Sequence, residues 1–299
     1  MFWSSPRTAI LLDSIYRSNP LHGDPRSKFY MLTISPAVEA RAIEKLRQEE
    51  LEEARAVQSL MLPAEVLCSG PVIIAHEFQP VDIVGGDFVD YFLMDNGNVG
   101  FYVGDVSGKG LPAAMYAALA VGILRSVHKT GQSPSEILST LNKRLMSRGG
   151  LQRHAAILYG VFDPRTLEMH LASAGMPGPL YLSATSCRVL DLSGIPPGLF
   201  VDVEYETLTL KLEPGDSILV CSDGIIEAQN ARYDDFGIAR LMNVCNEKSS
   251  LPPTELLAHI FAAVHSFTDV IRQHDDMAAV IFRLGSHETP KLPAAVGIS

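Results

Sequence analysis

Runs of apolar residues along the chain change their period several times, and each change predicts a new element of secondary structure. Residues 38–62 contain no Gly or Pro and are rich in Ala, Glu, Leu and Arg, which predicts a helix that Pro63 ends. After residue 70 short apolar runs take over, and Asn96–Gly97 between two of them is a strong hairpin-turn signal. One long helix is therefore expected to precede the first strands of a sheet.

The remaining apolar runs predict further elements. Two helices are expected over 111–129 and 134–146, and Ser133 is the candidate cap of the second. Strands are expected over 71–78, 87–94, 98–106, 154–163, 166–175, 179–184, 187–192, 203–212, 217–221 and 276–284, and helices over 237–245 and 254–271. Because strands and helices do not alternate regularly, a doubly wound or TIM-barrel fold is disfavoured. An α+β fold with separate layers of helix and antiparallel sheet fits this order better.

The same pattern suggests how the chain is organised. We expect an irregular N-terminal segment at 1–35, a linker helix at 36–63, one domain at 64–285 and a C-terminal tail at 286–299. In the linker helix Ala54, Val57 and Met61 lie about one turn apart, which predicts a weak apolar seam able to pack on a partner surface. A helix that only covers its own domain is the alternative interpretation.

Composition and charge narrow the class of protein. The 299 residues include 34 acidic and 24 basic ones, a formal charge of −10, and 47% are hydrophobic. This balance argues against long disorder and against non-specific nucleic-acid binding, which needs a basic surface. No signal peptide is evident, and the most apolar helical run, 113–124, is too short to span a bilayer. A soluble cytoplasmic protein is expected.

Four cysteines stand far apart: Cys68, Cys187, Cys221 and Cys245. Without a CxxC pair they exclude the usual zinc-ribbon spacing and a disulfide-dense scaffold. We expect four reduced and mostly buried thiols.

Four aspartates occupy the same kind of position, at one end of an apolar strand: Asp87, Asp105, Asp223 and Asp275. Glycines lie beside the first three, at Gly86, Gly104, Gly108 and Gly224. An ionised carboxylate beside a buried strand is costly unless it is paired or bound to a cation. Several carboxylates that converge make a hard oxygen site suited to magnesium or manganese. Taken singly, each residue could equally be a turn or cap residue. Taken together, they make a shared metal site as good an interpretation.

Three competing motifs fail. The sequence GDVSGKG at 104–110 lacks the first glycine of a phosphate-binding P-loop and has Gly110 where Ser or Thr should follow the lysine. The sequence GGDFVD at 85–90 departs from the diguanylate cyclase signature at Phe88 and Val89. Cys221 lacks the arginine six residues later that a cysteine phosphatase uses for phosphate. These classes of enzyme are disfavoured.

Five segments in order resemble the motifs of PPM-type, metal-dependent serine/threonine phosphatases. They are GGDFVD (85–90), GDVSGKGLPAAM (104–115), SDGIIEAQN (222–230), DDFG (234–237) and DDM (275–277). The resemblance is closest to the bacterial SpoIIE-like branch, whose members regulate sigma-factor switches. In addition, AVQSLMLP (56–63) is similar to the junction between helix and domain in that branch. The resemblance covers about residues 56–284.

The resemblance implies an αββα sandwich of two antiparallel sheets flanked by helices, with two divalent ions, manganese or magnesium, in a cleft between the sheets. By motif, Asp105 would bridge both ions and the backbone carbonyl of Val106 would complete one of them. Asp223 and Asp275 would hold one ion, and Asp87 would bind the other ion or its waters. A hydroxide that bridges the metals would attack the phosphorus of phosphoserine or phosphothreonine.

Some positions stay open or depart from the family pattern. The motifs do not decide whether Asp90 and Asp276 contact metal or are structural acids. Met176 stands where the family usually has His, and Ala278 where Thr or Ser is common. Lys109 is a candidate neighbour of the phosphate, although a solvated loop lysine is the more ordinary interpretation.

The sequence thus predicts a metal-dependent phosphoprotein phosphatase. By resemblance its substrate would be a phosphorylated anti-sigma-factor antagonist of STAS type, and the linker helix would join two copies into a switchable homodimer. A catalytically weak regulatory or scaffold module of the same fold is the main alternative. A nucleotide-signalling enzyme is disfavoured by the broken GGD signature.

Overall fold

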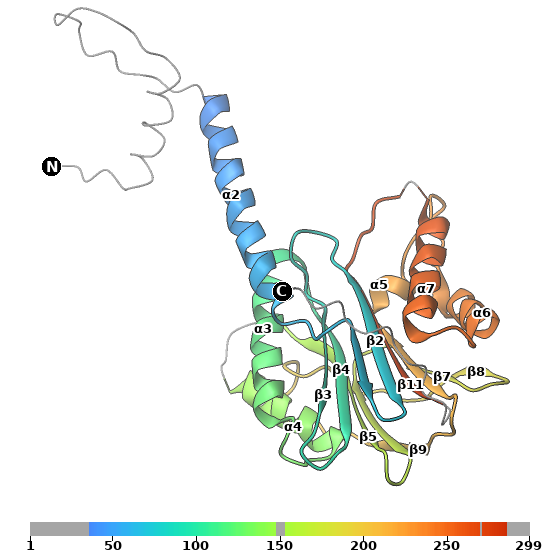
Figure 1. The fold of residues 1–299 in the computed structure, drawn as a ribbon. Coiled ribbons are helices and arrows are strands. Elements are labelled where there is room, and N and C mark those ends of the chain that lie inside the picture. Colours follow the sequence, from blue (N-terminus) through green and yellow to red (C-terminus); the bar gives the residue numbers. More distant parts are fainter. Residues whose placement is uncertain (1–35, 148–152, 270, 286–299) are drawn as a thin grey trace, which may run out of the picture. The chain divides into compact units, whose positions relative to one another are not determined.

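A computed structural model describes residues 36–147, 153–269 and 271–285 (Figure 1). The expectations for the N-terminal segment 1–35 and the tail 286–299 lie outside the described residues. The chain divides into two units, residues 1–47 and residues 48–299, and helix α2 (Pro36–Ser59) runs through the boundary. The fold described below is that of the second unit.

The last turns of α2 differ from the predicted seam. Val57 is 63% exposed and Leu60 is 81% exposed, whereas the polar Gln58 is only 8% exposed. Met61 follows the helix and packs on the domain core. Of the predicted face of Ala54, Val57 and Met61, Val57 is thus exposed, whereas Met61 contacts its own domain. The amide of Gln58 makes two hydrogen bonds to the domain that the pattern of hydrophobicity does not reveal.

Two antiparallel sheets form the centre of the domain. Among the described residues, one sheet has the order β1 (Val66–Ser69), β2 (Val72–Gln79), β11 (Met277–Leu284), β10 (Ser217–Cys221), β7 (Leu180–Leu182) and β8 (Cys187–Val189). The other has the order β3 (Phe88–Leu93), β4 (Val99–Val106), β5 (Ala155–Asp163), β6 (Glu168–Ala174) and β9 (Leu208–Lys211). Strand β1 was not predicted, and only the last part of the predicted strand at 203–212 forms, as β9.

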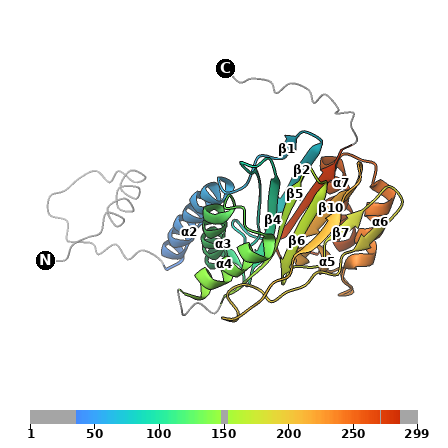
Figure 2. The same ribbon diagram turned by 90° about the horizontal axis from the view of Figure 1, so that it is seen from below.

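Helices cover the outer face of each sheet (Figure 2). Helices α3 (Gly110–Val127) and α4 (Pro134–Met146) pack on the β3–β9 sheet. Helices α5 (Asp223–Ile226), α6 (Gly237–Lys248) and α7 (Pro253–Thr268) pack on the β1–β8 sheet. This αββα order confirms the predicted α+β fold class.

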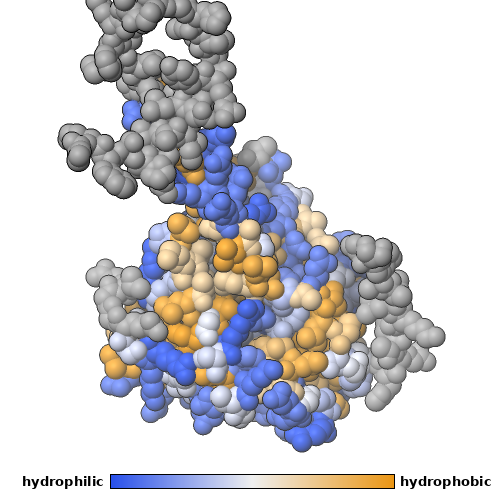
Figure 3. Space-filling model, turned by 60° about the vertical axis from the view of Figure 1, so that its left-hand side comes forward, coloured by the Kyte–Doolittle hydropathy of each residue, from blue (hydrophilic) through white to orange (hydrophobic). Residues whose placement is uncertain are grey.

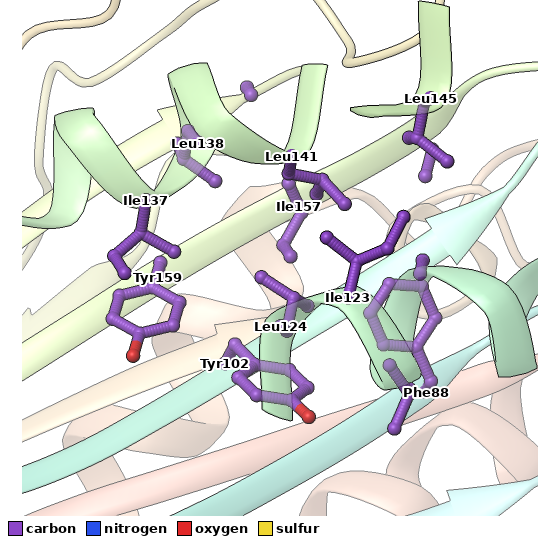
Figure 4. Close-up of a cluster of buried hydrophobic side chains, with 14 of the residues drawn as sticks. Phe88, Tyr102, Ile123, Leu124, Ile137, Leu138, Leu141, Leu145, Ile157 and Tyr159 are labelled. Atoms are coloured by element: carbon purple, nitrogen blue, oxygen red, sulfur yellow. The ribbon is translucent and has the colours of Figure 1, made fainter. Parts of the chain in front are cut away.

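The core lies in three layers because both sheets are covered on both faces. In β4 the aromatic ring of Phe101 faces the other sheet, where it stacks on Phe282, while Tyr102 faces the helices and stacks on Tyr159. Figure 4 shows the helix side of this strand, with Leu124 and Leu141 against the tyrosines. Burial of each such side chain stabilises the fold by about 1.5–3 kcal/mol.

Helix α3 is long and apolar enough, by length and composition, to cross a membrane, and no other helix of the described residues is. Its Ala113, Ala117, Ala120 and Leu124 are fully buried in the layer between α3, α4 and the sheet. Core helices of globular domains pass the same test of hydropathy. The apolar character of α3 is thus accounted for by packing.

No disulfide joins the four cysteines, which are all described and free. Cys221 and Cys245 are buried, Cys187 is half-buried and Cys68 is exposed. The expectation of mostly buried thiols therefore holds for only two of the four.

Candidate active site

The four predicted aspartates come from both sheets and meet at one end of the sandwich. Asp105 is the second-last residue of β4, and Asp87 directly precedes β3. Asp223 begins α5 immediately after β10, and Asp275 lies just before β11. Each sheet therefore supplies two carboxylates to the same place.

The proximity of these aspartates raises the pKa of three of their side chains. Burial first, and then the carboxylates of Asp223 and Asp275, raise the pKa of Asp105 to about 6, although the Asp87 side chain works against the rise. Burial and the Asp105 charge hold the pKa of Asp87 well above its usual range. Burial and the Asp275 charge raise the pKa of Asp223. Several negative charges in a partly desolvated place therefore repel one another.

Glycines permit the close approach of these segments. A Cβ atom on Gly86 would lie 2.9 Å from the Val106 carbonyl oxygen and 3.5 Å from Asp105 Oδ1. A Cβ on Gly224 would overlap the backbone carbonyl of Asp276. The glycines beside the acids are therefore required by packing, as the sequence suggested. The Val106 carbonyl also lies close to the Asp87 segment.

Asp276 organises the segment that carries Asp87. Its carboxylate accepts hydrogen bonds from the backbone N–H of Val81 (2.8 Å) and of Gly86 (2.6 Å), and its side chain is buried. Both oxygens are thus engaged with the backbone. This arrangement gives Asp276 a structural role beside the cluster.

Asp90 also has a structural environment. It accepts hydrogen bonds from Arg125 Nε (2.8 Å) and from the Tyr102 hydroxyl (2.9 Å). Arg125 in addition donates to the Met61 carbonyl (2.6 Å), which ties α3 to the chain that follows α2. These partners satisfy Asp90 as a buried anion, away from the carboxylates described above.

Gln58 is a contact that sequence reasoning missed. Its Nε2 donates to the carbonyl of Gly85 (2.8 Å), and the N–H of Gly85 donates to its Oε1 (3.2 Å). The last turn of α2 is thus bonded to the segment that carries Asp87. The only signal in the sequence was a glutamine inside the motif AVQSLMLP.

A cleft of about 270 Å³ opens beside the carboxylates. It is lined by Asp105, Ala156, Gly175, Met176, Pro177, Asp223 and Glu227. Met176 is almost fully buried and gives this wall an apolar surface where the family usually has an imidazole. Glu227, at the end of α5, is a second lining residue that sequence reasoning did not single out.

The donor chemistry of the site suits hard divalent cations. Oδ2 of Asp87 is buried and has no hydrogen-bond partner, which is costly for an anionic oxygen unless a cation approaches it. The other candidates are also oxygen donors, which magnesium and manganese prefer. Within the described part of the chain, however, no three acidic, histidine or cysteine side chains form a ready-made ligand set for one ion.

Comparisons with known proteins agree with this geometry. The sequence model of the family "Stage II sporulation protein E (SpoIIE)" matches residues 95–285. The chain is 26% identical to the phosphoserine phosphatase RsbU of Bacillus subtilis (strain 168) over 247 residues, which cover 81% of this chain and 72% of RsbU. It is 21% identical to the phosphoserine phosphatase RsbP of the same organism over 239 residues, 78% of this chain and 57% of RsbP.

Solved structures show the same fold. The SiaA-PP2C domain of Pseudomonas aeruginosa superposes with a TM-score of 0.72 at 22% identity, and covers 81% of this chain and 98% of that domain. The chain therefore belongs to the SpoIIE family and is a phosphoprotein phosphatase with the PP2C fold.

Proposed function

We infer that the chain is a divalent-metal-dependent protein phosphatase that hydrolyses phosphoserine or phosphothreonine on a signalling protein. The observation that carries this proposal is the convergence of Asp87, Asp105, Asp223 and Asp275 from two sheets beside a cleft. Their mutual repulsion is relieved by cations, and no buried cationic side chain is bonded to them within the described residues.

Each residue has a distinct proposed role. Asp105 lies between Asp87 and Asp223 and would be the shared ligand of two ions, with the Val106 carbonyl beside it. Asp223 and Asp275 would hold one ion, and Asp87 the other ion or its waters. When bound, manganese or magnesium would activate a water and neutralise the phosphoryl oxygens. The protein contributes the fixed placement of the carboxylates and a cleft that admits the phosphorylated side chain.

The substrate proposal rests on the relatives. RsbU and RsbP are named phosphoserine phosphatases, which supports a phosphoserine protein as the substrate of this chain as well. We propose an anti-sigma-factor antagonist of STAS type, dephosphorylated in the cytoplasm. The cleft beside Asp105 and Asp223 is open enough for a side chain presented by a folded protein.

A turnover assay tests the activity. Hydrolysis of p-nitrophenyl phosphate and of a phosphoserine peptide should require manganese or magnesium, and EDTA should abolish it. If the protein has no metal-dependent turnover but binds a phosphoprotein tightly, the alternative of a regulatory or scaffold module replaces this proposal. The presence of all four carboxylates argues against that alternative.

The linker helix is proposed to join two copies of the chain. Val57 and Leu60 are exposed near the end of α2, and most of the visible surface of α2 is hydrophilic in Figure 3, which fits a weak seam. Because Gln58 holds Gly85, a shift of α2 in a dimer would reach the segment that carries Asp87. A weak seam suits such a switch, since its two arrangements differ by only a few kcal/mol.

The dimer proposal has its own test. Val57→Glu should lower the dimer fraction in analytical ultracentrifugation and change the specific activity with it. Met61 is a poor probe, because it packs on its own domain. If a protein that begins at Glu65 matches the full chain in oligomeric state, metal affinity and specific activity, α2 is a lid and the switch is wrong.

A further inference from the structure

The loop between β4 and α3 carries Lys109 toward the carboxylate of Asp275. The lysine lies between Gly108 (φ +93°) and Gly110 (φ +68°), a backbone shape that glycine adopts readily. Although it occupies the N-cap position of α3, its side chain makes no capping hydrogen bond. Instead its ammonium group donates to the carbonyl of His274 and lies 3.4 Å from Asp275 Oδ2. The loop that follows β4 in one sheet thus reaches the Asp275 carboxylate, which lies just before β11 in the other sheet.

This ion pair differs from the other contacts of the carboxylates. Within the described residues it is the one ion pair that involves Asp87, Asp105, Asp223, Asp275 or Asp276. The lysine side chain is 47% exposed and that of Asp275 is 40% exposed, so the pair lies at the solvent side of the cluster. Arg153, a cation of the segment before β5 that reaches this loop, donates to the Ser107 carbonyl and is bonded to backbone.

A divalent ion at Asp275 Oδ2 would repel the ammonium group that lies 3.4 Å from this oxygen. Two cations that share one carboxylate oxygen repel each other strongly, and the ion carries twice the charge. The lysine has a flexible four-carbon stem, and its half-exposed ammonium group is held by the His274 carbonyl and Asp275, so it is the group that moves. Once displaced, its charge stays at the solvent side of the site, where a phosphoryl dianion enters.

We propose that Lys109 exchanges partners: it neutralises Asp275 in the metal-free protein and binds the phosphoryl group of the substrate once a divalent ion has taken Asp275. This inference rests on the proposed function, because it assigns the phosphate-binding residue of that site. A lysine serves as a mobile point charge for phosphate, and in the described part of the chain Lys109 is the lysine or arginine that forms an ion pair with the cluster. Lys109 would therefore compete with the metal and favour the substrate.

The full-length chain can test both halves of the exchange. Lys109→Met removes the charge but keeps much of the apolar stem, and Lys109→Arg keeps a cation. Lys129→Met is the matched control, since Lys129 forms an exposed ion pair with Asp95 at 3.8 Å. For each protein, manganese affinity is measured by calorimetry after chelation, and inorganic phosphate is titrated as an inhibitor at saturating manganese.

The expected result is a pair of opposite shifts. Lys109→Met should bind manganese about threefold to tenfold more tightly, because no ammonium competes for Asp275. Its inhibition constant for inorganic phosphate should rise about tenfold, because the anion has lost a charged partner. Lys109→Arg should retain most of the phosphate affinity, and Lys129→Met should match the wild type in both measurements.

Three outcomes would overturn the proposal. An unchanged phosphate constant in Lys109→Met removes the lysine from phosphate binding, even if manganese affinity shifts. An unchanged manganese affinity removes the competition. A lower melting temperature with both constants unchanged shows that Lys109 only pins two loops together. In all three cases a wild type that turns over with manganese leaves the proposed function standing, whereas a wild type without manganese binding or turnover overturns both.

Discussion

Two buried acidic regions lie close together in the sequence and differ in how their charge is satisfied. Asp90 has Arg125 at 2.8 Å and the Tyr102 hydroxyl at 2.9 Å, and it joins β3, α3 and the chain after α2. Asp87 has a buried oxygen without a partner, and its neighbour Asp105 carries a further negative charge. Both residues belong to the motif GGDFVD, yet only Asp90 has a cationic partner within the protein.

The difference teaches which buried acids serve stability and which await a ligand. A buried carboxylate with an arginine and a hydroxyl has replaced its lost water contacts. Carboxylates that raise one another's pKa have not replaced their lost water contacts, and their repulsion destabilises the folded state at the site. The comparison can be tested in two ways: Arg125 can be removed from Asp90, or a divalent cation can be supplied to the cluster around Asp87.

The largest expected effect is on catalysis. Asp105→Asn should lower metal-dependent turnover by about a hundredfold or more, because the proposed shared ligand loses its charge. The fold should remain, since the change also removes repulsion within the cluster. Turnover of p-nitrophenyl phosphate and circular dichroism measure the two. Asp163→Asn is the matched control, because Asp163 also ends a strand but pairs with Arg165 at the surface. Near-normal turnover of Asp105→Asn would remove this residue from the mechanism.

On the other side of the comparison, Arg125→Met should destabilise the fold. It leaves the buried Asp90 without its cation and frees the Met61 carbonyl, and we expect a loss of about 3 kcal/mol in the free energy of unfolding. Urea unfolding of the metal-free protein measures it. Arg165→Met, at an exposed pair, should cost less than about 1 kcal/mol. Equal unfolding midpoints for the two variants would contradict the structural role of Asp90.

Supplying the cation should stabilise the cluster. An ion that binds only the folded state at a concentration 100 times its Kd adds about 2.7 kcal/mol to the free energy of unfolding. The melting temperature should therefore rise with millimolar manganese in the wild type, and much less in Asp105→Asn. If millimolar manganese leaves the melting temperature of the wild type unchanged, these carboxylates form no metal site.

The smallest effect should be on the pH dependence of the metal-free protein. The pKa of Asp105 is raised to about 6 in the folded state, above its usual value of 3.8, so the folded chain binds this proton more tightly than the unfolded chain. The contribution of this group to stability therefore increases as pH falls from about 7 toward 4. The urea midpoint of the wild type minus that of Asp105→Asn, measured in EDTA, should rise over this range. A falling difference would contradict the repulsion within the cluster.

The sequence by itself determined the elements that depend on local pattern. The cap of α4 at Ser133 formed as expected, and Glu136 completes a capping box with it, because a cap joins residues only three positions apart. The order of strands and helices predicted separate layers of helix and antiparallel sheet, and the family resemblance predicted their αββα order. Aspartates at strand ends marked the carboxylates that the folded chain brings close enough to raise one another's pKa.

Tertiary structure alone decided the contacts between segments remote in sequence. Gln58 and Gly85 are 27 positions apart, Asp90 and Arg125 are 35 apart, and Asp276 and Gly86 are 190 apart. No local period encodes such pairs, since each depends on how several layers pack. For the same reason the sequence could not tell Asp90 from Asp87: both are acids beside a buried strand, and only the folded chain places an arginine on one and other carboxylates beside the other.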